Sequence, residues 1–259
     1  MYDEVADNNS ELTELRLAVF CYNFPHKKSQ DFIIRLFLEG IKVVCVFAAN
    51  PVELNIPPAS IRTKIRHIGL LHPRYIAERL GIEYFVAPHN SSEVITKIKD
   101  NNLNLGIIAG ARILKAPVIE SFSKGIINFH PGLIPEARGL DAMLWSIYKS
   151  IPLGVTAHLI DENIDAGYIL LKEKIFINPD DTLLDLSERL YDKQIEMIKP
   201  AIKATLLGNY IPVDSTTPYN RKMPVELEKT IPDLLPHYLQ KQIENDIDKT
   251  SMCRINRIK

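Results

Sequence analysis

Short apolar segments alternate with amphipathic segments in the first half of the chain. Residues 15–22 and 41–48 are almost continuously apolar, which is typical of strands buried on both faces of a parallel sheet. Between them, residues 29–39 carry apolar side chains at helical spacing and end at Gly40, a frequent helix stop. This order of strand, helix and strand predicts a parallel sheet with a crossover helix.

The same alternation continues toward the middle of the chain. It predicts helices over residues 73–80 and 92–100 and strands over residues 84–87 and 103–109. Residues 49–69 contain three prolines and show no clean period, so we expect a loop or an insertion over the sheet.

The second half of the chain begins with a buried strand over residues 126–129 that ends at His130-Pro131-Gly132. Further elements are predicted in sequence order: a helix over 140–149, a strand over 154–160, an acidic loop over 161–167, a strand over 168–177 and a helix over 183–207. Thr182 and Asp185 resemble a capping box before that last helix, and Pro200 predicts a kink within it.

Residues 209–259 differ in character, because prolines interrupt them and only a short helix near 234–247 is indicated. We therefore expect two parts: an α/β domain over residues 15–208 and a small C-terminal appendage over residues 209–259. The appendage is interpreted as a cover for the acceptor site or as a contact with a partner subunit, and a solvated extension is the alternative.

Composition narrows the class of protein. With 259 residues and 46% hydrophobic content the chain can bury a full core, and a net charge of −1 gives no general attraction to nucleic acid. No secretory leader and no apolar run of membrane-spanning length is evident, so we expect a cytoplasmic protein that contacts no membrane. Cys21 and Cys45 lie in apolar runs and are expected to be reduced and buried. His72 and His89 form no ligand spacing with other residues, so no metal site is expected.

The chemistry-bearing residues cluster between positions 126 and 167. Asn128 and His130 lie two apart on a predicted strand, so their side chains point to the same side. If the ends of the strands at 126–129 and 154–160 lie side by side, a carboxylate of the acidic loop reaches the imidazole. An amide can donate to an oxyanion, an imidazole can transfer a proton near neutral pH, and a carboxylate can favour the charged imidazole. This set of groups suits acyl transfer to an amine without a nucleophilic Ser or Cys.

These residues also resemble a known family. The segments Asn128-Phe-His130-Pro-Gly-Leu-Ile-Pro135, Arg138-Gly139, Gly154-Val-Thr156, His158 and Asp161 to Gly167 are similar to the signature of the 10-formyltetrahydrofolate-dependent formyltransferases. The similarity is clearest over residues 103–175. Gly132 departs from the family pattern, which usually has Ser there. The resemblance implies a Rossmann-like α/β fold with a mostly parallel central sheet flanked by helices, and 10-formyltetrahydrofolate as formyl donor.

Site roles follow from the same resemblance, position by position. Asn128, His130 and Asp165 match the catalytic residues. Arg112, Ile113 and Leu114 match a segment that lines the slot for the pterin ring of the folate, while Asp161, Glu162 and Ile164 would close that slot. The alternative for Ile113 and Leu114 is simple core packing after a strand.

Further residues are candidates for contact with the acceptor substrate. Lys27 and Lys28 precede a helix and can meet a phosphate, although surface lysines are usually only solvated. Arg138 and Gly139 belong to the signature. Trp145 is either a core anchor or a stacking residue, and His158 is either a satisfied core histidine or a contact of the site.

The acceptor itself is inferred by elimination. The first turn, Asn23-Phe-Pro-His26, lacks the glycine-rich phosphate loop of glycinamide ribonucleotide enzymes, and the last fifty residues are too few and too mixed in charge for a tRNA-binding domain. We therefore predict N-formylation of a nucleotide-linked amino sugar, a step of surface glycan biosynthesis. Glycinamide ribonucleotide, methionyl-tRNA, hydrolysis of the folate and a non-catalytic binding module remain alternatives, and a homodimer is implied only by the resemblance.

Overall fold

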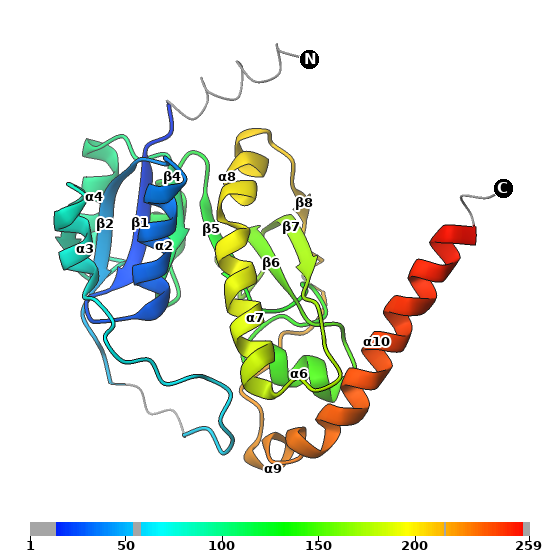
Figure 1. Cartoon of the computed structure of the whole chain (residues 1–259). Coiled ribbons are helices and arrows are strands. Elements are labelled where there is room, and N and C mark those ends of the chain that lie inside the picture. The colour runs from blue at the N-terminus through cyan, green and yellow to red at the C-terminus, as the bar shows by residue number, and fades with distance from the viewer. Residues whose placement is uncertain (1–13, 54–57, 215, 256–259) are drawn as a thin grey trace.

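The computed structural model describes residues 14–53, 58–214 and 216–255, with side-chain surroundings described up to residue 245. Within these residues an eight-stranded sheet has the order β3-β2-β1-β4-β5-β6-β7-β8 (Figure 1). Its strands are β1 (Leu17–Tyr22), β2 (Val43–Ala49), β3 (Glu83–Val86), β4 (Leu105–Ile108), β5 (Ile126–His130), β6 (Gly154–Leu159), β7 (Tyr168–Lys174) and β8 (Ile211–Pro212). The first five are parallel and the last three run antiparallel. The mostly parallel α/β sheet predicted from the sequence is confirmed.

Helices cover both faces of this sheet. They are α2 (Lys27–Leu38), α3 (Pro73–Arg79), α4 (Ser92–Asp100), α5 (Ala116–Ile119), α6 (Ala142–Tyr148), α7 (Leu183–Glu196), α8 (Ile198–Leu206), α9 (Val225–Glu228) and α10 (Ile231–Ile255). Strand β1 shows the reason, because Leu17 and Val19 join the core beneath α2, α7 and α8, whereas Ala18 and Phe20 join the core beneath α4 and α5. Cys21 and Cys45 are free and buried, as predicted.

Two helix boundaries differ from the expectation. The predicted helix over 183–207 is two helices that meet at Met197, three residues before Pro200. Proline clashes with the carbonyl four residues earlier, so the break falls one turn ahead of the ring. The capping box of Thr182 and Asp185 is present at the start of α7. Helix α2 begins at Lys27 and not at residue 29, because the His26 side chain accepts the backbone N–H of Ser29.

The C-terminal region forms more helix than the sequence suggested. A short helix was expected near 234–247, but α10 runs from Ile231 to Ile255. Its first turns pack Leu235, Tyr238 and Leu239 into the core next to α6, and the rest extends away from the body (Figure 1). Among the described residues, no helix is long and apolar enough to cross a membrane.

Residues 217–223 lie against the segment that follows β5. Gly139 pairs with Asn220, the Lys149 ammonium donates to the Asn220 side chain at 2.6 Å, and Asp141 accepts the backbone N–H of Met223. A Cβ at Gly139 would overlap the Asn220 carbonyl, and the φ of Gly139 is +94°, so glycine is required at this contact. This part of the predicted appendage is therefore packed directly behind the segment that bears Arg138 and Gly139.

Candidate active site

The antiparallel pairing of β5 with β6 builds the centre of the site. Asn128 lies opposite His158, and His130 lies opposite Thr156. The expectation that the two strand ends lie side by side is wrong, because the carboxyl ends of two antiparallel strands lie at opposite ends of the pair. The loop after β6 instead folds back along the strands, with Asp165 in a left-handed conformation at φ +43°, and returns its carboxylate to His130.

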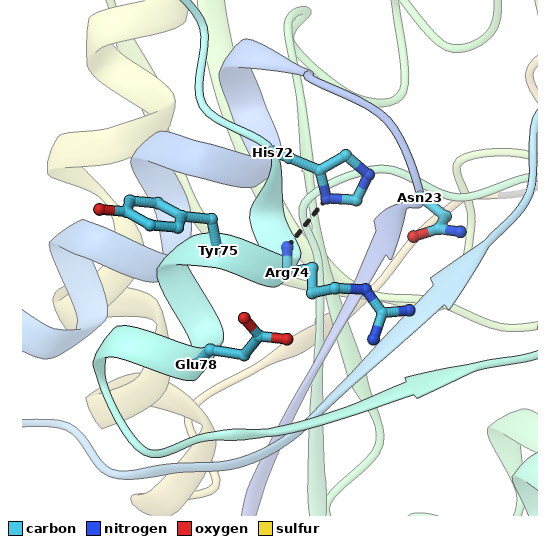
Figure 2. Close-up of a pocket in the computed structure, with 5 residues that line it drawn as sticks. All are labelled: Asn23, His72, Arg74, Tyr75 and Glu78. Atoms are coloured by element: carbon cyan, nitrogen blue, oxygen red, sulfur yellow. Dashed lines mark hydrogen bonds between the residues drawn. The ribbon is translucent and has the colours of Figure 1, made fainter.

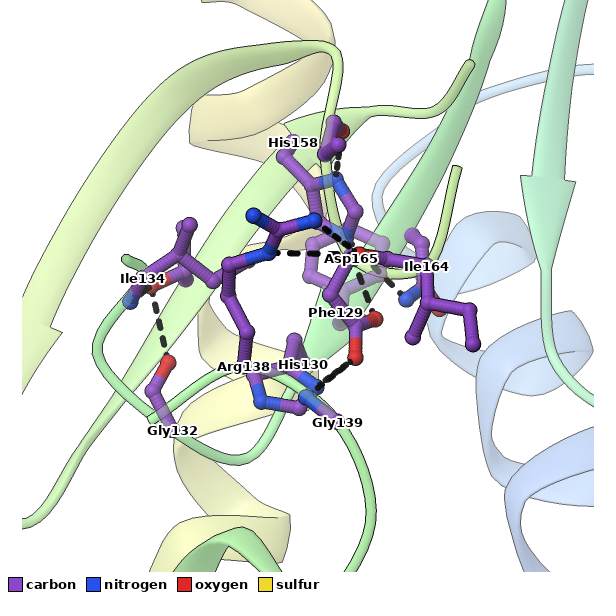
Figure 3. A network of polar contacts seen from close by, with 12 residues as sticks. Phe129, His130, Gly132, Ile134, Arg138, Gly139, His158, Ile164 and Asp165 are labelled. Atoms are coloured by element: carbon purple, nitrogen blue, oxygen red, sulfur yellow. Dashed lines mark hydrogen bonds and ion pairs between the residues drawn. The ribbon is translucent and has the colours of Figure 1, made fainter. Parts of the chain in front are cut away.

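Four polar side chains converge there, as Figure 3 shows in part. The His130 Nδ1 atom lies 3.3 Å from Asp165 Oδ2, and Asn128 Nδ2 lies 3.2 Å from His158 Nε2. His158 Nε2 also lies 3.9 Å from Asp165 Oδ1. We call Asn128, His130, His158 and Asp165 the catalytic cluster; it unites the three residues predicted as catalytic and one predicted as a substrate contact.

His158 fixes the orientation of the Asn128 amide. Its Nδ1 faces the Ala166 carbonyl at 2.9 Å and must carry the hydrogen, so Nε2 accepts from Asn128 Nδ2. Burial lowers the pKa of His158 to about 4, and this neutral form keeps Nε2 an acceptor at physiological pH. The second N–H of Asn128 is then directed by its partner and remains a donor for an oxyanion.

His130 lies between two acceptors. Its Nε2 is 2.7 Å from the Ala137 carbonyl, and its Nδ1 faces Asp165, so the doubly protonated ring is the form that donates to both. In that form the ring supplies positive charge to the cluster, and direct donation from Nε2 to an oxyanion would replace the Ala137 contact. Gly132 is needed here because a Cβ would lie 2.8 Å from the Ala137 oxygen. A serine, as in the family pattern, would displace that carbonyl.

Asp165 is held ionised. Burial opposes the charge, but the contact with His130, the neighbouring His158 and the backbone N–H of Gly139 at 2.9 Å together lower the pKa of Asp165 to about 2. A carboxylate with such partners remains a stable anion beside the imidazolium. The predicted substrate residue Gly139 thus acts on Asp165 through its backbone.

Arg138 was predicted to contact the acceptor, but its guanidinium is bound to backbone carbonyls of this chain. It is buried, and its guanidinium donates to the Ile164 carbonyl at 2.7 and 3.2 Å (Figure 3). It also donates to the Thr217 carbonyl at 3.0 Å. It thereby ties the loop of Asp165 to the C-terminal region. Trp145 has a similar role, since its indole N–H donates to the Arg221 carbonyl at 2.8 Å and its ring packs beside the core. The core-anchor interpretation fits that placement.

The two candidate lysines, Lys27 and Lys28, lie in different surroundings. Lys27 pairs with Asp31 on the surface of α2 at 2.9 Å. Lys28 points the other way, 3.3 Å from the carbonyl of Phe129, which stands between Asn128 and His130. Burial and the charge of Lys64 lower the pKa of Lys28 to about 8, although Asp165 acts in the opposite direction. Only Lys28 therefore adds a cation to the catalytic cluster.

The predicted folate slot has open backbone groups on one side. The Leu114 side chain is buried in the core, whereas Ile113 is exposed. Asn90 holds the Ile113 carbonyl and the Lys115 N–H, and Tyr22 holds the Ala111 carbonyl. Among the described residues, the backbone N–H and C=O groups of Arg112 and Leu114 have no such partner. Alternating free donors and acceptors suit the edge of a pterin ring.

The acidic loop on the other side is shaped by its own contacts. Asp161 accepts from the backbone and the side chain of Asn163, the Ile164 carbonyl is taken by Arg138, and Glu162 is exposed. The side chains of Glu162 and Ile164 are therefore the ones left to meet a ligand. No group of His, Cys, Asp and Glu suited to a metal occurs in the described part of the chain.

Two hollows lie outside the catalytic cluster. The smaller, about 260 Å³, is at the start of α3, where His72 Nδ1 accepts the backbone N–H of Arg74 (Figure 2). The Arg74 guanidinium lies 4.7 Å above the Tyr84 ring. The larger, about 480 Å³, lies beside Arg112 at the ends of the parallel strands. Sequence reasoning missed it, because its walls come from four separate strand ends.

Comparisons with known proteins identify the family and the fold. The family model described as Formyl transferase matches residues 66–202. The methionyl-tRNA formyltransferase of Thermodesulfovibrio yellowstonii is 35% identical over 124 residues, which are 47% of this chain and 40% of that protein. The chain spans about half the length, or less, of the curated relatives it matches.

Solved structures share the fold. The phosphoribosylglycinamide formyltransferase of Anaplasma phagocytophilum gives a TM-score of 0.58 at 20% identity and covers 81% of this chain and 98% of its own. A sugar N-formyltransferase from Shewanella sp FDAARGOS_354 gives 0.58 at 21% identity, with 86% and 87% covered. The family match extends over more than half of the residues and includes the whole catalytic cluster, so this chain belongs to the formyl transferase family.

Proposed function

We propose that this protein transfers a formyl group from 10-formyltetrahydrofolate to an amine, and that the amine belongs to a nucleotide-linked amino sugar. The observation that carries the reaction class is the convergence of Asn128, His130, His158 and Asp165 at one point. This cluster offers an oriented N–H donor, a cationic ring and a buried carboxylate, and it contains no nucleophilic Ser or Cys.

The mechanism follows from these groups. The neutral amine of the acceptor attacks the formyl carbon of the donor, and the carbonyl oxygen becomes the oxyanion of a tetrahedral intermediate. Asn128 Nδ2 donates to this oxyanion, and the His130 charge, held by Asp165, stabilises it. The attacking nitrogen loses a proton while the N10 leaving group gains one, which yields the formamide and tetrahydrofolate. Asp165 is suited to pass this proton through water.

The relatives and the position of Lys28 support the acceptor class. The structural relatives include a sugar N-formyltransferase and a phosphoribosylglycinamide formyltransferase, and a sequence relative is a methionyl-tRNA formyltransferase. Lys28 favours an acceptor with a phosphate near its amine, which nucleotide-linked sugars have. The net charge of −1 and the small number of basic residues among positions 210–259 do not favour tRNA as the acceptor.

The direct test is release of tetrahydrofolate, followed by absorbance, with purified protein, 10-formyltetrahydrofolate and a panel of acceptors. The panel contains amino-sugar nucleotides, glycinamide ribonucleotide, methionyl-tRNA and water alone. We expect release with one amino-sugar nucleotide. Release with water alone would identify a hydrolase, and no release at all would contradict the proposed reaction.

Lys28 provides a prediction about acceptor binding. Replacing it by glutamine should raise the KM for a phosphate-bearing acceptor about tenfold at pH 7 and change kcat little, because one charge-assisted contact is lost. Lys28 is charged below a pKa of about 8 and neutral above it, so the wild-type KM should rise above pH 8. That rise should be absent in Lys28→Gln. Steady-state kinetics over pH 6.5–9.5 measure both effects.

The matched control is Lys27→Gln, because Lys27 neighbours Lys28 in sequence and is paired with Asp31. Its KM should match the wild-type value at every pH. A Lys28→Gln variant with unchanged KM would remove this residue from the acceptor site without affecting the assignment of the reaction.

A further inference from the structure

Residues 217–223 are held against residues 138–149, which carry Gly139 and helix α6. Four side chains of residues 138–149 make the contacts. Arg138 donates to the Thr217 carbonyl at 3.0 Å, Lys149 to the Asn220 side chain at 2.6 Å and Trp145 to the Arg221 carbonyl at 2.8 Å, while Asp141 accepts the Met223 N–H at 2.8 Å. The family model ends at residue 202, so its match does not include residues 217–223. The contacts themselves therefore indicate the role of this segment.

Asn220 pairs through its backbone with the two residues beside Gly139. Its N–H donates to the Arg138 carbonyl at 2.8 Å, and its carbonyl accepts the Leu140 N–H at 2.9 Å. These two bonds form a parallel bridge, in which the N–H of the residue between them points away from the partner strand. The Gly139 N–H is therefore free to donate to Asp165 Oδ2, at 2.9 Å.

The side chain of Asn220 is fixed as well as its backbone. Only 7% of the residue is exposed, and its Oδ1 accepts from the ammonium of Lys149, which also lies 5.0 Å from the centre of the Trp145 ring. A hydrogen bond from a charged donor is stronger than one between neutral groups, so Lys149 holds Asn220 firmly. The Asn220 Nδ2 has no partner in the described part of the chain, which is a cost that a purely structural contact could avoid with an apolar residue.

The Gly139 N–H and the catalytic imidazole meet the same oxygen of Asp165. Asp165 Oδ2 lies 2.9 Å from the Gly139 nitrogen and 3.3 Å from His130 Nδ1. Asp165 belongs to a loop and has a left-handed backbone conformation, so contacts from outside the loop are needed to hold it. The Gly139 N–H is such a contact. A shift of Gly139 would therefore move the carboxylate away from the ring that it supports.

We propose that Asn220 is a positioning residue for formyl transfer, which fixes Gly139 so that the Gly139 N–H holds Asp165 Oδ2 against His130. In this role Asn220 touches neither the formyl donor nor the acceptor and acts only through Gly139 and Asp165. The proposal rests on the proposed function of the catalytic cluster. It gives residues 217–223 a part in the reaction that is additional to a cover or to a contact with a partner subunit.

The first test is the kinetics of Asn220→Ala, which removes the acceptor of Lys149 and loosens the bridge. We expect kcat to fall about tenfold or more, as for other displacements of a catalytic group, with KM little changed for both substrates. Lys149→Met removes the donor of the same bond and should give the same loss, so it replaces Asn220→Ala if that variant does not fold. A wild-type kcat in both variants would overturn the proposal.

The matched controls remove the same groups from the exposed surface of the same half of the chain. Lys203 lies on α8 and Asn209 follows it, and both are exposed. Asn209→Ala and Lys203→Met should therefore keep the wild-type kcat. Thermal unfolding shows that each variant is folded before its kinetics are compared.

A double-mutant cycle separates positioning of Asp165 from a general loosening of the site. In an Asp165→Ala background the Gly139 N–H has no carboxylate to hold, so adding Asn220→Ala should leave the remaining single-turnover rate unchanged. A general structural role would lower the rate by the same factor with or without Asp165. Equal factors in the two backgrounds would therefore overturn the proposal.

Hydrogen exchange of the Gly139 amide gives a readout that needs no activity. Loss of its bond to Asp165 should make this amide exchange about tenfold faster or more in Asn220→Ala, while the amides of β1 keep their wild-type rates. An unchanged Gly139 rate would overturn the proposal even if formyl transfer is found. Faster exchange in a protein that transfers no formyl group would instead contradict the proposed function and leave the fixing of Gly139 by Asn220 in place.

Discussion

Replacing Asn128 by alanine is expected to lower kcat on the order of 100-fold or more, because loss of one oriented oxyanion donor costs at least that much in acyl-transfer enzymes. The hydrogen bond from Asn128 forms only in the transition state. The KM values for 10-formyltetrahydrofolate and for the acceptor should therefore change little. His158 fixes the amide so that one N–H remains directed toward the reacting oxygen. Single-turnover and steady-state kinetics on the purified variant measure the effect.

Asn104→Ala is the matched control for this variant. Asn104 directly precedes β4, at the amino ends of the parallel strands, whereas His130 lies at the carboxyl end of β5. The Asn104 side chain accepts the backbone N–H of Arg16. Its loss removes an amide of the same size far from the catalytic cluster, so kcat should remain close to the wild-type value. Wild-type turnover in Asn128→Ala would exclude the assigned role.

Asp165→Asn should reduce kcat on the order of 10,000-fold, in line with the loss of the carboxylate partner of a catalytic histidine. Asp165 Oδ2 faces both His130 and the Gly139 N–H, and an asparagine oxygen can occupy the same position. The substitution therefore keeps the shape and the contacts and removes only the charge. The imidazolium form of His130 then loses its anion, and kcat is the parameter to measure.

The pH dependence of stability gives an independent check on Asp165. Its pKa in the folded protein, about 2, is below its ordinary value of 3.8, so ionised Asp165 stabilises the fold above about pH 4. This contribution, about 2 kcal/mol, is lost as the pH falls toward 2 and should be absent in Asp165→Asn.

Asp161→Asn is the matched control for the loss of kcat. Asp161 lies in the same loop but is bonded to Asn163, so this variant should retain most activity. An equal loss of kcat in Asp165→Asn and Asp161→Asn would contradict the special role of Asp165.

The layers of the fold were predictable from the sequence, because short apolar runs alternate with amphipathic segments of helical period along the first half of the chain. Continuous apolar runs such as 15–22 and 41–48 became central parallel strands, and Gly40 and Gly81 ended their helices with positive φ. The grouping of Asn128 and His130 was also predictable, since alternation along β5 places both side chains on one face.

Other features depended on contacts between segments distant in sequence. The antiparallel register of β5 and β6 pairs Asn128 with His158. The alternation of residues 154–160 predicts a strand but not its direction relative to β5, so this pairing was not predicted. The burial of Arg138 had no local signal, because its acceptors are backbone carbonyls at 164 and 217. The same applies to the pocket beside Arg112, whose walls come from four strand ends.

The Arg138 contacts also bear on how the protein matures during its synthesis. Arg138 reaches the Thr217 carbonyl and Gly139 pairs with Asn220, although the strands and loops of the catalytic cluster end at residue 167. A growing chain can complete the parallel part of the sheet once β4 and β5 have emerged, because β4 pairs with β1 and β5 pairs with β4. The loop that carries Asp165 can acquire its full set of contacts only after residues 217–220 have left the ribosome. The surroundings of Asp165 are therefore completed only after the parallel part of the sheet has formed.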